Sequence, residues 1–291
     1  MVEFINPITK KEISYHIDKK LKSKWDKLKE GKLAKIDEDR CYIVDGRERS
    51  GKSLFTFQQA KYIDPTFDVN RICFTPEAFL EEIKTASKGS VVVFDEAFRG
   101  LSSKSSQSKI NKMIVQAMME VGQRNLIIFI VLPTFFLLEM YAAVLRSNAL
   151  FHIYKEKTGK RAFRIYNYQK KALLYNVGKK KGFSYAFPKV ISRGRFFNIW
   201  SIDEEEYRQK KGNSLREIDK ELKTESNTRV DRAFKQRDLL LKQLYKEHKE
   251  INPKLTKKDF SKWLEGIGLE LSNSSIKELI GKDGENDSTT G

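Results

Sequence analysis

A glycine-rich loop that leads into a lysine and a serine carries the clearest chemical information in this sequence. Residues 46–53 match the phosphate-binding pattern G-x-x-x-x-G-K-[ST] at every fixed position. Backbone N–H groups that converge at a helix N-terminus hold a polyphosphate, and glycines keep side chains out of its way. The lysine of such a loop reaches the β- and γ-phosphates, and the hydroxyl ligates Mg²⁺. The residues expected to contact the nucleotide are Gly46, Arg47, Glu48, Arg49, Ser50, Gly51, Lys52, Ser53 and Leu54.

Two adjacent carboxylates form the second candidate group. Asp95 and Glu96 directly follow the apolar run Val91–Phe94, which has the length of a buried strand. We expect Asp95 to hold Mg²⁺ together with Ser53, and Glu96 to polarise the water that attacks the γ-phosphate. A strand can also end in two acids simply because it reaches solvent. The phosphate-binding lysine upstream favours the catalytic interpretation.

The elements needed to position these residues alternate along the chain. Strands are expected at residues 41–44, 71–74, 91–94 and 126–132, and helices at 54–62, 76–86 and 135–145. This alternation predicts an α/β fold, with a mostly parallel sheet covered by helices on both faces. Residues 126–145 are apolar enough to suggest a membrane span, but Pro133 divides them into a strand-length and a helix-length piece. We therefore expect no transmembrane segment.

Composition restricts the compartment and the partner. The formal net charge is +17 over 291 residues, which favours an acidic polymer as partner. The two cysteines, Cys41 and Cys73, lie in apolar runs and imply no disulfide framework. The N-terminal residues lack the order of a signal peptide. These features predict a cytoplasmic protein.

With Lys52, Ser53, Asp95 and Glu96 in place and one strand between the two motifs, residues 38–168 resemble a P-loop ATPase of the additional-strand, catalytic-glutamate division. Within that division, the layout resembles the FtsK/HerA-type DNA-translocating ATPases and the zonula-occludens-toxin-like ATPases of phages and archaeal mobile elements. The resemblance implies an enzyme that hydrolyses ATP with Mg²⁺. It also implies DNA as a partner and a homo-oligomeric, hexamer-like ring.

Three further residues take candidate roles from this resemblance. Arg124 and Arg146 each end a helical segment, where such proteins present an arginine finger to the nucleotide of a neighbouring subunit. Either arginine could instead only favour a helix dipole. Thr134 stands where relatives usually place a polar sensor, often Gln, and it is the side chain available there to hydrogen-bond the attacking water. This departure from the pattern could mean slow hydrolysis.

Residues 151–200 give the strongest indication of a partner. They hold thirteen Lys or Arg and one acid, Glu156, with aromatic residues interleaved. We expect β-hairpins here, with short strands at residues 162–168 and 196–199, that complete the sheet. They would contact nucleic acid through Lys179, Lys180, Lys181, Arg193 and Arg195. An acidic protein or an anionic membrane surface would also suit this charge.

The predicted organisation has five parts. They are an N-terminal helical segment (1–40), an ATPase core with the basic extension (41–200), a charged helical linker (201–250), a helix-turn-helix-like module (251–282) and a disordered tail (283–291). Within the linker, residues 210–214 resemble a break between helices. In the module, Asn273, Ser274, Ser275 and Lys277 would face a DNA groove.

The sequence therefore predicts an ATP-driven DNA translocase or packaging motor of a virus or mobile element. One alternative is an ATP-switched DNA-binding loader or regulator with slow hydrolysis. A second is an ATPase that moves or assembles protein.

Overall fold

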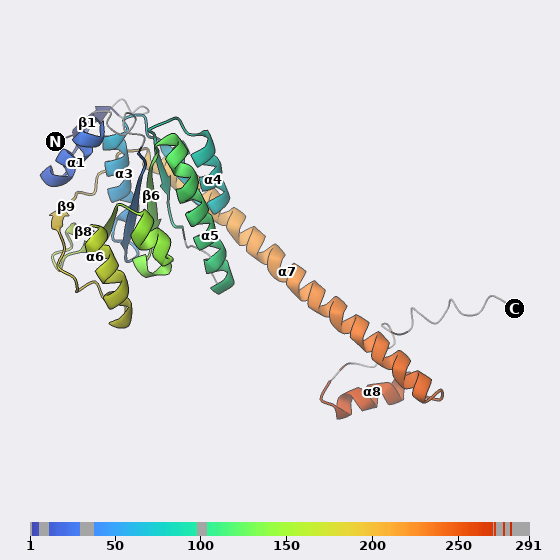
Figure 1. The fold of residues 1–291 in the computed structure, drawn as a ribbon. Coiled ribbons are helices and arrows are strands. Elements are labelled where there is room, and N and C mark those ends of the chain that lie inside the picture. Colours follow the sequence, from blue (N-terminus) through green and yellow to red (C-terminus); the bar gives the residue numbers. More distant parts are fainter. Residues whose placement is uncertain are drawn as a thin grey trace. The chain divides into compact units, whose positions relative to one another are not determined.

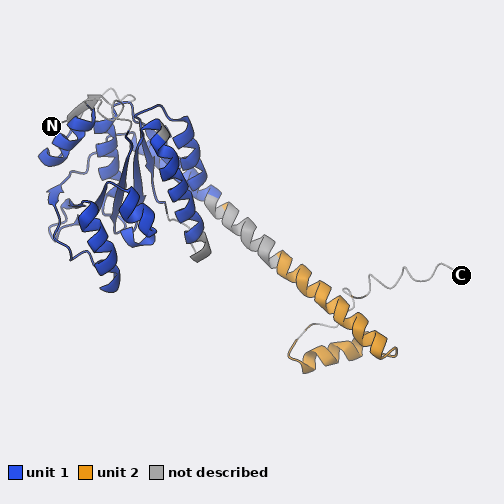
Figure 2. Ribbon diagram, viewed as in Figure 1, with its two compact units in different colours: residues 1–217 blue, residues 218–291 orange. Residues whose placement is uncertain are grey.

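A seven-stranded sheet organises the larger of the two units into which the chain divides, residues 1–217 and 218–291 (Figure 2). The structure is a computed structural model and describes residues 2–5, 12–29, 38–97, 104–269, 271, 276 and 280. The strands lie in the order β4 (Ile72–Cys73), β5 (Val91–Phe94), β6 (Ile127–Leu132), β3 (Arg40–Gly46), β7 (Ala149–Lys155), β8 (Arg161–Tyr166) and β9 (Ser192–Arg195). The first five run parallel, whereas β8 and β9 are antiparallel additions. The predicted α/β class with a mostly parallel sheet is confirmed.

Helices bury both faces of this sheet (Figure 1). Alternate strand residues point to opposite faces, so Tyr42 and Val44 enter one core and Cys41 and Ile43 enter the other. The first core also contains side chains of α1 (Lys19–Lys27), α3 (Lys52–Ile63) and the first turn of α7 (Glu204–Ile251). The second contains those of α4 (Pro76–Thr85), α5 (Lys104–Glu120) and the π-helical turns Tyr141–Arg146 and Leu174–Gly178. The short helix α6 (Tyr168–Leu173) leads directly into the second of these turns.

The N-terminal segment, expected to be helical, also contains an antiparallel pair of strands. β1 (Val2–Ile5) pairs with β2 (Glu12–Tyr15), and α1 begins only at Lys19 because the Asp18 side chain accepts the Lys20 N–H. Tyr15 is buried, and its hydroxyl donates to the Gln58 carbonyl of α3 at 2.8 Å. This hairpin therefore ends against the helix that follows the phosphate-binding loop.

Two local expectations differ from the structure. Residues 135–145 do not form one helix: a 3₁₀ turn at Phe135–Leu137 precedes the π-helical turn, because the Asn111 side chain bonds the backbone between them at Leu137 and Glu139. The expected strand at 196–199 is also wrong, since β9 ends at Arg195. Among the described residues, no helix is both long and apolar enough to cross a bilayer.

The second unit has a small core of its own. Leu241 and Tyr245 of α7 pack with Phe260 and Leu264 of α8 (Lys257–Gly266) and with Ile276. Thr256 and Asp259 form a reciprocal capping box that begins α8. The break expected at 210–214 is wrong, because α7 continues through it. The groove-facing residues Asn273, Ser274, Ser275 and Lys277 and the tail at 283–291 lie outside the described residues.

Candidate nucleotide site

The glycine-rich loop joins the end of β3 to the start of α3, and its backbone requires glycine at two points. Gly46 has φ +145°, and a Cβ there would lie 2.1 Å from the Ile153 carbonyl oxygen of β7. Gly51 has φ +99° and is the N-cap residue of α3. The loop therefore passes close to β7 and then presents the N-terminus of α3 toward its own concave side.

The loop's lysine and one serine fit a bound anion. Lys52 Nζ donates to the carbonyl oxygens of Gly46 at 2.9 Å and Arg47 at 3.1 Å, so its ammonium group is folded into the loop. Burial lowers the pKa of Lys52, while the nearby carboxylates of Asp95, Asp45 and Glu96 oppose that shift. The buried Ser50 hydroxyl has no hydrogen-bond partner among the described residues. A phosphate group in the loop would satisfy both side chains.

The two sequence motifs meet at a hydrogen bond. Ser53 Oγ donates to Asp95 Oδ1 at 3.1 Å, and Asp95 is fully buried at the end of β5, so burial raises the pKa of its carboxyl group. Glu96 follows with φ +58°, a conformation that a non-glycine residue rarely adopts. Among the described residues, no cluster of three or more His, Cys, Asp or Glu side chains could hold a metal. Mg²⁺ needs only one or two protein oxygens when phosphates supply others, and Ser53 and Asp95 fit that requirement.

A cavity of about 1290 Å³ connects these groups. Its lining includes both motifs, the hairpin between β7 and β8, and the first turns of α7: Glu48, Arg49, Gly51, Lys52, Ser53, Leu54, Glu96, Leu132, Pro133, Lys155, Arg161, Asn198, Trp200, Glu204, Tyr207, Arg208, Lys211, Gly212 and Leu215. Six of the nine loop residues expected at a nucleotide thus line one cavity together with Glu96.

Two side chains of α7 contact the acidic pair, and the sequence patterns did not indicate them. Tyr207 donates its hydroxyl to Asp95 Oδ2 at 2.6 Å, and Lys211 forms an ion pair with Glu96. Burial and the Asp95 carboxylate raise the pKa of the Tyr207 hydroxyl, so it remains a donor. The spacing of four residues, which places 207 and 211 on one helix face, is the local pattern that could have suggested a shared role.

A second buried carboxylate, Asp45, lies on the strand just before the loop. It accepts the Phe135 N–H at 2.8 Å, contacts His152 Nδ1 at 2.8 Å and accepts the Tyr185 hydroxyl. Thr134, the candidate sensor, shares a hydrogen bond of 2.9 Å with Tyr185. Thr134 is absent from the lining of the nucleotide cavity, where Leu132 and Pro133 of the same segment lie instead. A role for Thr134 at the γ-phosphate stays a prediction.

The two candidate finger arginines lie at the other end of the sheet. They precede β6 and β7, whereas the loop follows β3, and these three strands are parallel. Arg124 donates to the Ala86 carbonyl at 3.2 Å and is exposed. Arg146 pairs with Asp39 and donates to the Met118 carbonyl at 3.0 Å. Neither reaches the nucleotide cavity of its own chain, so a catalytic role requires a neighbouring subunit.

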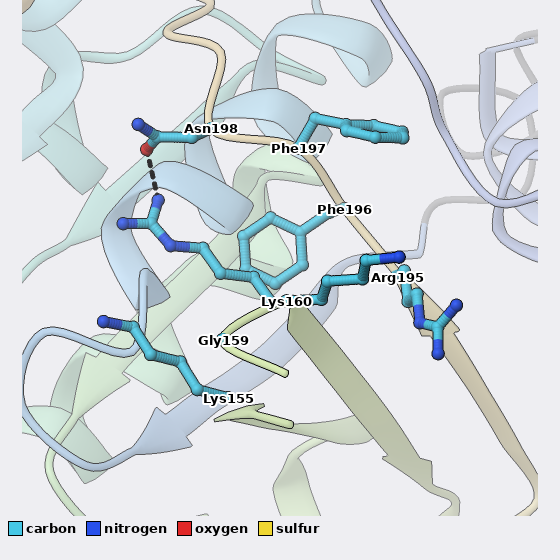
Figure 3. A pocket seen from close by; sticks show the side chains of 8 residues that line it. Lys155, Gly159, Lys160, Arg195, Phe196, Phe197 and Asn198 are labelled. Carbon is cyan, nitrogen blue, oxygen red and sulfur yellow. Dashed lines mark hydrogen bonds between the residues drawn. The ribbon is translucent and has the colours of Figure 1, made fainter. Parts of the chain in front are cut away.

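The candidate nucleic-acid residues of the basic extension are exposed. Lys179, Lys180 and Lys181 lie at the end of a π-helical turn, and Arg193 and Arg195 lie on β9. Arg195 pairs with Glu156 across the sheet edge at 2.8 Å. Figure 3 shows Lys155, Lys160 and Arg195 around a second cavity of about 550 Å³. Their exposure is compatible with contacts to a polyanion.

Comparison with known proteins assigns no family to the chain. No protein family matches the sequence, and no curated protein matches it. Among solved structures, the chain is similar to the N-terminal domain of zonular occludens toxin from Neisseria meningitidis, at 17% identity and a TM-score of 0.30. That match covers 53% of this chain and 94% of the other. The candidate site therefore rests on its own geometry.

Proposed function

We propose that this protein is a Mg²⁺-dependent ATPase that works on DNA, as a ring-forming translocase or packaging motor of a virus or mobile element. The observation that carries the ATPase proposal is the hydrogen bond between Ser53 and Asp95. It joins the phosphate-binding loop to the acidic pair, and Ser53 and Glu96 line the same cavity. Phosphate-binding and water-orienting groups are thereby within reach of one triphosphate.

Different residues of the chain would bind the phosphates, hold Mg²⁺ and activate the attacking water. Lys52 would turn from the loop carbonyls to the terminal phosphates, and the Ser50 hydroxyl would gain a partner. Ser53 and Asp95 would hold Mg²⁺, which when bound neutralises charge on the β- and γ-phosphates. Glu96 would orient the attacking water and accept its proton.

DNA is the proposed partner because of the distribution of charge. The exposed cations Lys179, Lys180 and Lys181 are consecutive, and the net charge is +17. Cations that contact phosphates bind nucleic acid without reading its sequence. In a ring, Arg124 is better suited than Arg146 to reach a neighbour's nucleotide, because Arg146 is already paired with Asp39.

The test is ATP turnover by the wild type and by Glu96→Gln, with and without duplex DNA, across a salt series. DNA should stimulate the wild type, and raising salt from about 50 to 200 mM should abolish the stimulation. Glu96→Gln should still bind nucleotide but turn over about a hundredfold more slowly. The control is Glu81→Gln, which removes an exposed carboxylate outside the cavity.

The two halves of the proposal fail separately. Undiminished hydrolysis by Glu96→Gln would refute the assignment of the active site. Hydrolysis that ignores DNA at low salt would leave the ATPase intact and favour a protein-moving ATPase over a DNA motor.

A further inference from the structure

The hairpin between β7 and β8 lies directly against the phosphate-binding loop. A Cβ placed on Gly51 would lie 3.0 Å from Arg161 Cδ and 3.3 Å from Arg161 Cζ. Arg161 in turn donates to the Asn198 side-chain oxygen, the bond drawn as a dashed line in Figure 3. Arg161, Asn198 and Lys155 line both the nucleotide cavity and the adjoining cavity of about 550 Å³.

The order of strands fixes the direction in which a nucleotide must lie. The acidic pair ends β5, two strands away from β3 on one side, whereas β7 and β8 lie on the other side of β3. The terminal phosphate must point toward Glu96 if Glu96 orients the attacking water. The nucleoside half must then extend toward Arg161 and Asn198.

We propose that Arg161 and Asn198 form the nucleoside-binding part of this site and select adenine. The proposal rests on the proposed ATPase function. A guanidinium plane stacks on an aromatic base, and a side-chain amide matches the donor and acceptor on the N6/N7 edge of adenine but not the O6/N7 edge of guanine. Arg161, one of the thirteen Lys and Arg of residues 151–200, is thereby assigned to the nucleotide.

The test compares binding of ATP, GTP and inorganic tripolyphosphate by calorimetry. Asn198→Ala should reduce the preference for ATP over GTP by about tenfold. Arg161→Ala should weaken both nucleotides by about tenfold and tripolyphosphate by less than about threefold. Lys157→Ala removes a cation of the same hairpin that lines neither cavity and should change nothing.

The proposal would be overturned if Arg161→Ala lost as much affinity for tripolyphosphate as for ATP. It would also be overturned if Asn198→Ala kept the wild-type preference for ATP over GTP. Wild-type protein that binds neither ATP nor tripolyphosphate would instead refute the ATPase function itself. Lys52→Ala provides the reference for a phosphate contact, since it should weaken all three ligands.

A second, independent observation concerns the start of α7. Tyr207 is 4% exposed, and its ring packs against those of Phe57 at 5.0 Å and Trp200 at 5.5 Å while its hydroxyl bonds Asp95. Lys211 Nζ contacts both the Glu96 carboxylate and the Tyr207 hydroxyl. The neighbouring Lys210 bonds the carbonyl oxygens of Val69 and Asn70 at 2.9 and 2.8 Å. These contacts hold the first turns of α7 against the acidic pair after β5 and against the segment that precedes β4.

We infer that Lys211 restrains Glu96, so that hydrolysis rises when the ion pair opens. This inference also rests on the ATPase function. An ammonium group bound to a carboxylate competes with the water that the carboxylate must orient. Tyr207 positions Asp95 from the same helix face, so movement of these turns changes both carboxylates together.

Lys211→Met should raise kcat about fivefold and leave ATP affinity unchanged. A fivefold change corresponds to the free energy with which a partly exposed ion pair holds its two side chains together. Lys235→Met is the control and should leave kcat unchanged, because Lys235 is an exposed lysine of the same helix outside the cavity lining. Amide hydrogen exchange at residues 204–215 should quicken in Lys211→Met without nucleotide, a readout independent of turnover. A lower kcat in Lys211→Met would overturn the inference and make Lys211 a direct aid to catalysis.

Discussion

Replacement of Gly46 by alanine tests the geometry of the phosphate-binding loop most directly. The new Cβ would lie 2.1 Å from the Ile153 carbonyl oxygen, and φ at this position is +145°. The shortest ordinary distance between a carbon and an oxygen that are not bonded is about 3.2 Å, so β3 and β7 would have to separate by about 1 Å. Overpacking and backbone strain together should cost about 3–5 kcal/mol, which is about 10 °C in melting temperature for a unit of this size.

Gly89 provides a matched control within the same unit. Its φ is +80°, but a Cβ there would meet no heavy atom of the described residues within 4 Å. Gly89→Ala should therefore cost only about 1 kcal/mol, the backbone part of the penalty. The melting temperatures of both variants are compared, and ATP binding is measured alongside. The difference between them gives the cost of the contact with Ile153, because both variants share the cost of a positive φ. Equal destabilisation of the two variants would refute the close approach of β7 to the loop.

Three further predictions concern buried polar groups and a helix cap. Burial lowers the pKa of Lys171 from 10.5 to about 8, so the unfolded chain binds this proton more tightly and stability should rise by about 2 kcal/mol from pH 8 to pH 10. Denaturant titrations should show no such rise in Lys171→Met; an identical rise there would contradict the assignment. In Asp45→Asn, the amide oxygen can take the Oδ2 position, which accepts both the Phe135 N–H and the Tyr185 hydroxyl, but the amide N–H₂ then faces His152 Nδ1 and all these bonds lose their charged acceptor; urea unfolding should show a cost of about 1–3 kcal/mol. Thr256→Ala removes the capping box of α8 and should destabilise the second unit by about 1 kcal/mol, while ATP affinity stays at the wild-type value.

Local patterns in the sequence suffice for four of the parallel strands, β3 to β6, and for the conformation of the glycine-rich loop. The strand expected at 91–94 has those same bounds in the structure, because four buried apolar residues end at two acids. Gly46 and Gly51 in the sequence predict the loop, because both positions have a positive φ that favours glycine. Such features depend on residues that are adjacent in the chain, so they can be predicted from the sequence alone.

Contacts between distant segments leave no comparable pattern. Tyr207 lies 112 positions from Asp95, and Lys211 lies 115 positions from Glu96. The lysine-rich stretch at 210–214 suggested a break, since Gly212 lowers helix propensity by about 1 kcal/mol. Tertiary bonds from Tyr207, Lys210 and Lys211 to the sheet edge offset that cost, so α7 continues through the glycine.

The cations of residues 151–200 show why charge alone cannot assign a surface. The thirteen Lys and Arg of this span formed one group by sequence. In the structure, Lys171 is buried and donates to the Ala143 and Val144 carbonyls, and Arg161 packs on Gly51. A buried cation cannot contact a phosphate and release its counterion, so the salt dependence of DNA binding should count only the exposed members. Composition predicts that a polyanion binds, but burial decides which lysines and arginines it meets.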